Sequence, residues 1–190
     1  MRTLGQAATL TRQEWKKLEC HANQKHCLIW ALLRFTAARI NEALQLRVRD
    51  VYHDPIRRIP LDSIVYRKET RKGKDKHHCV PVCSELRTYL KNYPVSVNLD
   101  DYLFPGSDGQ PLSYEAVLKY LQRTAVKAQL DDKRITTHSG RRSAITQLAQ
   151  QGTDLRTIQA ISGHASIANL QRYIDTDPQR TRLALEGIFA

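Results

Sequence analysis

Apolar residues recur with helical spacing along most of the chain. Thr11 and Glu14 begin the first such stretch with a capping-box pattern, in which both side chains bond the free amides of a helix start. Ser113, followed by Glu115, predicts the start of another helix. Further helices are predicted at about 27–33, 40–46, 84–92, 138–150, 154–161, 167–173 and 178–186. Gly152 and Gly163 are expected to end two of them, because glycine adopts the left-handed conformation of a C-cap.

Two short stretches have the character of strands instead. Residues 63–66 and 79–82 are rich in β-branched and aromatic side chains, and a polar, Lys-rich turn containing Gly73 separates them. The content of Gly, Pro and Asp in residues 104–111 predicts a loop. The expected fold is therefore mainly α with one small antiparallel β-sheet, an α+β arrangement, in a single domain over residues 1–190.

The balance of charged residues gives information about binding partners that the hydrophobic pattern does not contain. The 190 residues include 30 Lys and Arg against 19 Asp and Glu, a net charge of +11. Such an excess is typical of domains that meet a polyanion, most often nucleic acid. No apolar run approaches membrane-spanning length, and the N-terminal residues lack the apolar segment of a signal peptide. We therefore expect no membrane partner and a cytoplasmic location, with the four cysteines as reduced thiols.

Five polar residues attract attention through their positions. Arg39 is predicted at a helix start, and His138 and Arg141 are three residues apart, so they share one face of a helix. His164 follows a glycine, and Tyr173 comes nine residues later. Each has an ordinary explanation when taken alone: a solvated arginine, a capping histidine, or a tyrosine at the edge of the core. Their order and spacing are far more specific than any one of them.

Taken in order, the set resembles the catalytic domain of the tyrosine recombinases, the phage integrase family. That family carries Arg, Lys, His-x-x-Arg, His or Trp, and Tyr in this sequence. The residues that match are Arg39, a lysine of the hairpin turn, His138, Arg141, His164 after Gly163, and Tyr173. The resemblance covers the chain from Arg39 to Tyr173 and implies the fold of that catalytic domain.

Some positions depart from the family pattern. Ala37 stands where the family often has Gly, whereas Gly140 and Ser162 stand where it often has Leu. These residues neighbour the matching ones, so we expect them to affect packing more than chemistry. The lysine is ambiguous, because the turn contains several: counting back from the second strand favours Lys72, and Lys74 is the alternative.

The resemblance also implies a reaction. Tyr173 would attack a DNA phosphodiester and form a 3′-phosphotyrosine, and the strand would later be rejoined without ATP. Arg39, Arg141 and His164 would hold the phosphate. Two arginine forks suit its two non-bridging oxygens better than lysines do.

The remaining implied roles concern protons and orientation. Lys72 would protonate the leaving 5′ oxygen, and His138 would accept a proton or a hydrogen bond near the nucleophile. Glu42 lies one helical turn after Arg39 and is expected to orient the site rather than to react. Because cationic side chains act on the phosphate, the resemblance implies neither a metal nor any other cofactor.

Partners follow from the same resemblance. It implies double-stranded DNA and other recombinase protomers, with a monomer in free solution, tetramers on paired sites, and a bacterial or phage origin. Family members usually carry an N-terminal core-binding domain that closes around DNA. The first predicted helix begins near residue 12, so we expect that domain to be absent and DNA binding to be weak and salt-sensitive. The C-terminal tail is expected to pack either on its own domain or on a neighbouring protomer.

Three other functions compete with this interpretation. A type IB topoisomerase would share the chemistry, and a non-catalytic helix-turn-helix regulator would use the helices predicted on either side of Gly163. A zinc module would use either of two groups, Cys20, His21, His26 and Cys27, or His77, His78, Cys79 and Cys83. One predicted helix places Cys20 and Cys27 about 10 Å apart, and strand alternation points His77 and His78 to opposite faces. Neither geometry suits one tetrahedral zinc.

Overall fold

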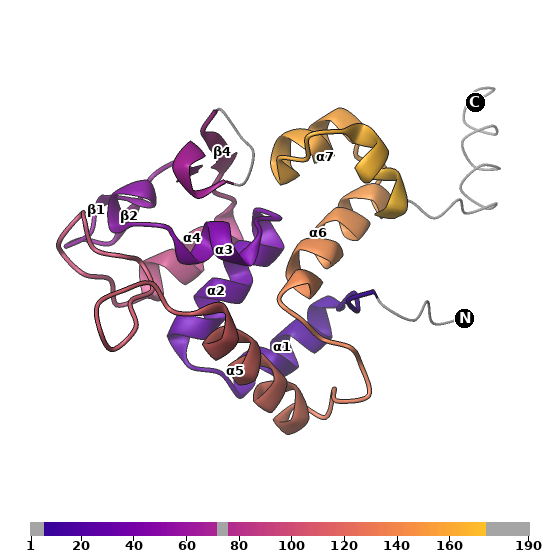
Figure 1. Cartoon of the computed structure of the whole chain (residues 1–190), viewed down its shortest axis with the longest axis horizontal. Helices are drawn as coiled ribbons and strands as arrows, with labels where there is room; N and C mark the ends of the chain where they lie inside the picture. Colours follow the sequence, from indigo (N-terminus) through magenta and orange to yellow (C-terminus); the bar gives the residue numbers. More distant parts are fainter. Residues whose placement is uncertain (1–5, 72–75, 174–190) are drawn as a thin grey trace.

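The computed structural model of the chain describes residues 6–71 and 76–173. The helix α2 (Gln24–Phe35) belongs to the main hydrophobic core. All residues from Leu28 to Leu33 are buried, because this helix is apolar on every side. It packs against α3 (Ile40–Leu44), α4 (Ser84–Asn92) and α6 (His138–Gln150). Figure 1 shows α2 near the centre of the molecule.

Two amphipathic helices lie side by side at one end of the molecule, α1 (Arg12–Cys20) and α5 (Tyr114–Lys127) (Figure 1). The capping box predicted for α1 is confirmed: the Thr11 side chain accepts from the Glu14 amide, and the Glu14 carboxylate accepts from the Thr11 amide. The predicted cap of α5 is confirmed too, because the Ser113 hydroxyl accepts from the Ala116 amide. Local sequence therefore sets where these helices begin.

The strands form two small antiparallel sheets, where one was predicted. The expected hairpin pairs β3 (Ser63–Tyr66) with β4 (His78–Pro81), one residue before the predicted second strand. A further pair, β1 (Tyr52–Asp54) and β2 (Ile59–Pro60), was not predicted. Two or three residues are too few to show strand alternation, so its pairing is visible only in the tertiary structure.

The chain after α6 differs most from the prediction. α7 (Leu155–Ser162) starts at an Asp154 cap and ends at Gly163, whose φ of 65° is left-handed, as expected of a C-cap. The helix predicted over 167–173 is wrong: two 3₁₀ turns, Ile167–Asn169 and Gln171–Tyr173, stand there. Without a second α-helix, the helix-turn-helix interpretation fails. The helix predicted over 178–186 and the C-terminal tail lie outside the described residues.

Two clusters of buried side chains stabilise the fold. The larger surrounds α2 and extends to α1, α4, α5 and the strands. The smaller lies under α6 and α7 and consists of Ala37, Ala144, Ile145, Ala149, Ile158 and Leu170. The 3₁₀ turns wrap around Leu170, which is fully buried. Within the described part of the chain, no helix is long and apolar enough to cross a membrane.

Candidate active site

Arg39 lies at a sharp turn between α2 and α3. The helix α2 ends at Phe35, and Ala37 then adopts a φ of 51°, a left-handed conformation that is unusual for a residue other than glycine. Arg39 follows as the N-cap of α3. Ala37 is fully buried, so the surrounding core holds this conformation. The turn directs the Arg39 side chain out of the core, where 42% of its surface is exposed.

Glu42 holds Arg39 through two contacts. One carboxylate oxygen accepts from the Arg39 backbone amide at 3.0 Å, and the other accepts from Arg39 Nη1 at 3.0 Å. The carboxylate is buried, with 5% of the side chain exposed. A second cation, Arg71, approaches the same carboxylate, with 3.6 Å between Arg71 Nε and Glu42 Oε1. The expectation that Glu42 orients the site therefore has a direct geometric basis.

α6 presents His138 and Arg141 from its first turn. His138 is exposed, whereas Arg141 is buried. Arg141 Nη1 donates to the backbone carbonyls of Ala37 and Ser162, the latter at 2.9 Å. Burial, followed by the charge of Arg39, lowers the pKa of Arg141 to about 10. The guanidinium stays charged at neutral pH.

His164 follows the glycine that ends α7. Arg141 Nη2 lies 3.0 Å from His164 Nε2 and 3.1 Å from Nδ1, and Ser162 Oγ lies 2.7 Å from Nδ1. Ser162 is buried and touches both groups, through its hydroxyl and its carbonyl. The Ser162 side chain therefore contacts a predicted site residue directly, and its expected effect on packing more than on chemistry stays a prediction.

Tyr173 closes the site from the last 3₁₀ turn. Its half-buried ring packs on the smaller core, 6.1 Å from the His164 ring between centroids. The Arg142 guanidinium lies over the same ring, 5.6 Å from its centroid. The Tyr173 ring is therefore half-buried and lies near both a histidine ring and a cation. Its position is at the edge of the core, where an amphipathic tyrosine is commonly found.

These side chains surround one open pocket of about 490 Å³. It is lined by Gln6, Ala7, Arg39, Tyr114, Arg134, Thr136, His138, Arg141, Arg142, His164 and Tyr173. None of these lining residues is acidic, and four are arginines. The fold thus brings five predicted site residues to one pocket, with Glu42 behind Arg39. Lys72 and Lys74 lie outside the described residues.

Sequence reasoning missed several residues of this site. Arg134, Arg142 and Tyr114 line the pocket, and Arg71 lies behind Glu42. Arg142 is adjacent to a predicted site residue, so its position was a usable signal. Arg71 stood among several cations of a polar turn, and nothing in the sequence distinguishes it from its neighbours.

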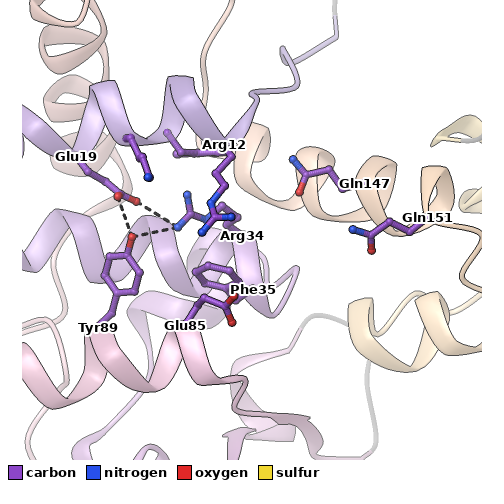
Figure 2. Close-up of a pocket in the computed structure, with 10 residues that line it drawn as sticks. Arg12, Glu19, Arg34, Phe35, Glu85, Tyr89, Gln147 and Gln151 are labelled. Atoms are coloured by element: carbon purple, nitrogen blue, oxygen red, sulfur yellow. Dashed lines mark hydrogen bonds and ion pairs between the residues drawn. The ribbon is translucent and has the colours of Figure 1, made fainter.

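A second pocket, of about 340 Å³, shares no lining residue with the first. Figure 2 shows its centre, where Tyr89 donates to Glu19 at 2.8 Å and Arg34 contacts both side chains. The Arg34 guanidinium also stacks on the Phe35 ring, 4.4 Å from its centroid. Because its central cation already pairs with Glu19, this pocket has a different character from the acid-free one.

The cysteine and histidine groups do not converge. Among the described residues, no three His, Cys, Asp or Glu side chains are grouped so that they would hold a metal ion. One argument against zinc was nevertheless wrong. Cys20 ends α1 and Cys27 belongs to α2, so the two do not share a helix. Helical rise therefore does not give their separation.

Comparison with known proteins identifies the family. The model of the phage integrase family matches residues 8–180. The chain belongs to this family. Its curated relatives include the tyrosine recombinases XerD of Staphylococcus saprophyticus, 30% identical over 159 residues, and of Staphylococcus aureus, 29% identical over 159 residues. Each match covers 80% of the chain and 50% of the relative, so the chain spans about half the length of the relatives it matches.

Solved structures of recombinases have the same fold. The XerA recombinase aligns with a TM-score of 0.73 at 24% identity, over 98% of this chain and 65% of that one. The XerH site-specific recombinase, bound to its difH substrate before cleavage, aligns with a TM-score of 0.70 at 27% identity, over 96% of this chain and 55% of that one. The fold class expected from the sequence, mainly helical with a small antiparallel sheet, is confirmed, with two such sheets in the described residues in place of one.

Proposed function

We propose that the chain supplies the catalytic domain of a site-specific recombinase, which cleaves and rejoins DNA strands through a 3′-phosphotyrosine. The observation that carries the proposal is one acid-free pocket lined by Arg39, His138, Arg141, His164 and Tyr173. Cations that line a pocket without any carboxylate in the same lining favour an anionic ligand. A tyrosine beside that anion supplies a nucleophile.

The side chains have distinct parts in the proposed step. Arg39 and Arg141 bind the two non-bridging oxygens of the phosphate, and His164 donates to one of them. The Tyr173 oxygen forms a bond to phosphorus while the bond from phosphorus to the 5′ oxygen breaks. The phenol proton passes to His138. Charge that develops on the phosphoryl oxygens is stabilised by cations fixed before the reaction, which is the efficient form of electrostatic catalysis.

The departing 5′ oxygen needs a proton, which we assign to Lys72, with Lys74 as the alternative. A DNA duplex with sulfur in place of that oxygen tests the assignment, because a thiolate leaves without protonation. Replacing the acid by alanine slows cleavage of the normal duplex and spares the sulfur-substituted one. Lys72→Ala and Lys74→Ala are therefore compared on both duplexes. A loss of equal size on both would contradict an acid role for that lysine.

Trapping of the covalent adduct tests the proposal as a whole. The probe is a pool of labelled duplexes of randomised sequence, each with a nick that lets the cleaved end diffuse away. The wild type is expected to retain label through denaturation, and mass spectrometry is expected to find the nucleotide on Tyr173. Tyr173→Phe is expected to form no adduct. Absence of an adduct with the wild type would contradict the proposed function.

Tyr114 provides the matched comparison, because it is the other tyrosine of the pocket. Tyr114→Phe makes the same chemical change and is expected to keep the adduct. If Tyr114→Phe abolished it while Tyr173→Phe did not, the nucleophile would be wrongly assigned and the reaction class would still stand.

We further propose that the working form is an assembly on DNA. The XerH relative is described as bound to its difH substrate, and a lambda integrase relative as a dimer bound to a core site. For this chain we expect a monomer in free solution and tetramers on paired sites. Light scattering with and without the duplex captured in the trapping experiment measures both. A stable tetramer without DNA would contradict this part of the proposal.

A further inference from the structure

Arg71 is a buried cation outside the pocket. Only 7% of the residue is exposed, and its Nε makes no hydrogen bond to any of the residues that the structure describes. Its Nη1 donates to the Lys76 carbonyl at 2.9 Å, and its Nε lies 3.6 Å from Glu42 Oε1. A buried guanidinium destabilises a fold unless partners compensate it. Arg71 is therefore placed by specific contacts rather than left in solvent like most arginines.

The Arg71 guanidinium also lies against the turn that carries His164. A Cβ added to Gly163 would lie 2.7 Å from Arg71 Nη2 and 3.2 Å from His78 Nε2. His78 Nε2 in turn lies 2.9 Å from the Ile161 carbonyl, at the end of α7. Glycine at this position thus serves two purposes: it allows the left-handed turn, and it leaves the space that the Arg71 guanidinium occupies beside that turn.

Glu42 stands between two cations of different exposure. Its Oε1 lies 3.0 Å from Arg39 Nη1 on the pocket side and 3.6 Å from Arg71 Nε on the buried side. Side-chain exposure is 42% for Arg39 and 6% for Arg71. With Arg71 absent, the full charge of the carboxylate would act on Arg39. With Arg71 present, part of that charge is compensated, and Arg39 keeps more of its own for an incoming anion.

We propose that Arg71 is a positioning residue for strand cleavage, acting through Glu42 on Arg39 and through the Gly163 turn on His164. The inference rests on the proposed function, because it assigns Arg39 and His164 to the phosphate. Arg71 touches neither the pocket nor the reacting atoms. Its effect is to set where two phosphate-binding groups stand.

Arg71→Gln and Arg71→Lys test the proposal in the adduct-trapping reaction at saturating DNA. In metal sites, removal of a group that orients a ligand commonly costs about 10–100-fold in activity, and by analogy we expect a loss of that order for Arg71→Gln. Binding of the duplex is expected to change little. Arg71→Lys keeps the charge beside Glu42 and is expected to recover part of the rate. If duplex affinity fell while the cleavage rate did not, Arg71 would be a binding residue and the proposal would be overturned.

A double-substitution cycle tests the route through Glu42. If Arg71 acts on Arg39 through that carboxylate, the loss from Arg71→Gln shrinks once Glu42→Gln has removed the charge. Losses that multiply fully in Arg71→Gln with Glu42→Gln would overturn this route.

Arg67 offers a matched control four residues earlier. It also pairs with a buried carboxylate, with 3.1 Å between Arg67 Nε and Asp50 Oδ2, but it does not line the pocket. Arg67→Gln removes the same kind of ion pair and is expected to lower the melting temperature with an unchanged cleavage rate below it. If Arg67→Gln slowed cleavage as much as Arg71→Gln, general loosening would explain both results and the proposal would be overturned.

A binding measurement separates this inference from the proposed function. Inorganic phosphate is titrated into ¹⁵N-labelled wild type and Arg71→Gln, and the Nε–Hε signals of Arg39 and Arg141 are followed. In the wild type both signals are expected to shift; in Arg71→Gln the affinity seen at Arg39 is expected to fall several-fold. Wild-type signals that never shift would count against the proposed anion site and against this inference with it. Equal affinity at Arg39 in both proteins would overturn the role of Arg71 alone.

Discussion

Arg141 shows how a single residue depends on its surroundings. Backbone carbonyls of Ala37 and Ser162 accept from its Nη1, so two peptide dipoles compensate a charge that burial disfavours. The Ala37 carbonyl belongs to the turn between α2 and α3, where Ala37 itself has a positive φ, and the Ser162 carbonyl ends α7. The guanidinium is thereby fixed in direction before any ligand arrives. An arginine held in this way loses little entropy on binding a phosphate.

His26 gives a prediction at the same scale. Its ring stacks on Tyr120 with 3.5 Å between centroids, and burial lowers its pKa to about 4, helped by the charges of Lys25 and Arg123. The unfolded chain, with an ordinary histidine pKa, binds this proton more readily than the folded one. Stability contributed by neutral His26 is therefore present above about pH 6.5 and is lost as the pH falls towards 4.

Urea unfolding at pH 7.5 and pH 5.5 measures this effect. His26→Phe keeps an aromatic ring against Tyr120 and cannot take up a proton. We expect the free energy of unfolding to fall less between the two pH values in His26→Phe than in the wild type. An identical fall in both proteins would show that the buried histidine does not cause it.

At the scale of elements, the approach of α6 to α2 decides where the site forms. α6 carries His138 and Arg141, and α2 leads into the turn that carries Arg39. The two helices come together at Gly140, where an added Cβ would lie 2.7 Å from Leu33 Cβ and 3.3 Å from its carbonyl carbon. The departure from the family pattern at Gly140 therefore has a packing reason, as expected.

Gly140→Ala tests this close approach. Alanine favours a helix over glycine, so a solvent-exposed site would gain stability. Here the clash involves the Cβ and backbone of Leu33, which move only with the helix, and overpacking of this kind costs about 1–3 kcal/mol. We expect a lower free energy of unfolding in urea, whereas the exposed control Gln150→Ala on the same helix is expected to change little. A Gly140→Ala protein as stable as the wild type would contradict the close packing.

At the scale of the whole molecule, the excess of basic residues includes four arginines gathered around one pocket. The net charge is +11, and the pocket that contains Tyr173 has no acidic residue in its lining. Neutralising each phosphate of duplex DNA releases counterions, so affinity falls steeply with salt. The same charge is expected to speed association at low ionic strength.

Duplex affinity measured at several salt concentrations tests whether the pocket is a preferred site of phosphate contact. Arg134 lines the pocket without belonging to the predicted catalytic set. If it contacts one phosphate, Arg134→Ala reduces the slope of log affinity against log salt by about 1. Arg57, in the turn between β1 and β2 and outside the pocket lining, is the control, and Arg57→Ala is expected to keep the slope. Equal changes in both variants would indicate a diffuse attraction without a preferred pocket.

The sequence alone determined the features that depend on neighbouring residues. Helix starts at Thr11 and Ser113 were predictable because a cap forms within a few residues, and the end of α7 at Gly163 because only the local backbone is involved. The family was predictable as well, since its chemistry requires certain residue types in a fixed order. From that order alone, Arg39 and Tyr173 were predicted to share one site, although the sequence does not give the distance between them.

Only the tertiary structure decided which other groups surround the predicted site residues. The β1–β2 pairing, the 3₁₀ turns before Tyr173 and the contact of Ser162 with His164 all depend on segments far apart or on packing around Leu170. Arg71 is the clearest case, because its partners Glu42 and Gly163 come from two other parts of the chain. In the sequence Arg71 is one of several neighbouring cations. Folding distinguishes it by burying its charge, and a buried charge destabilises the fold unless it is paired.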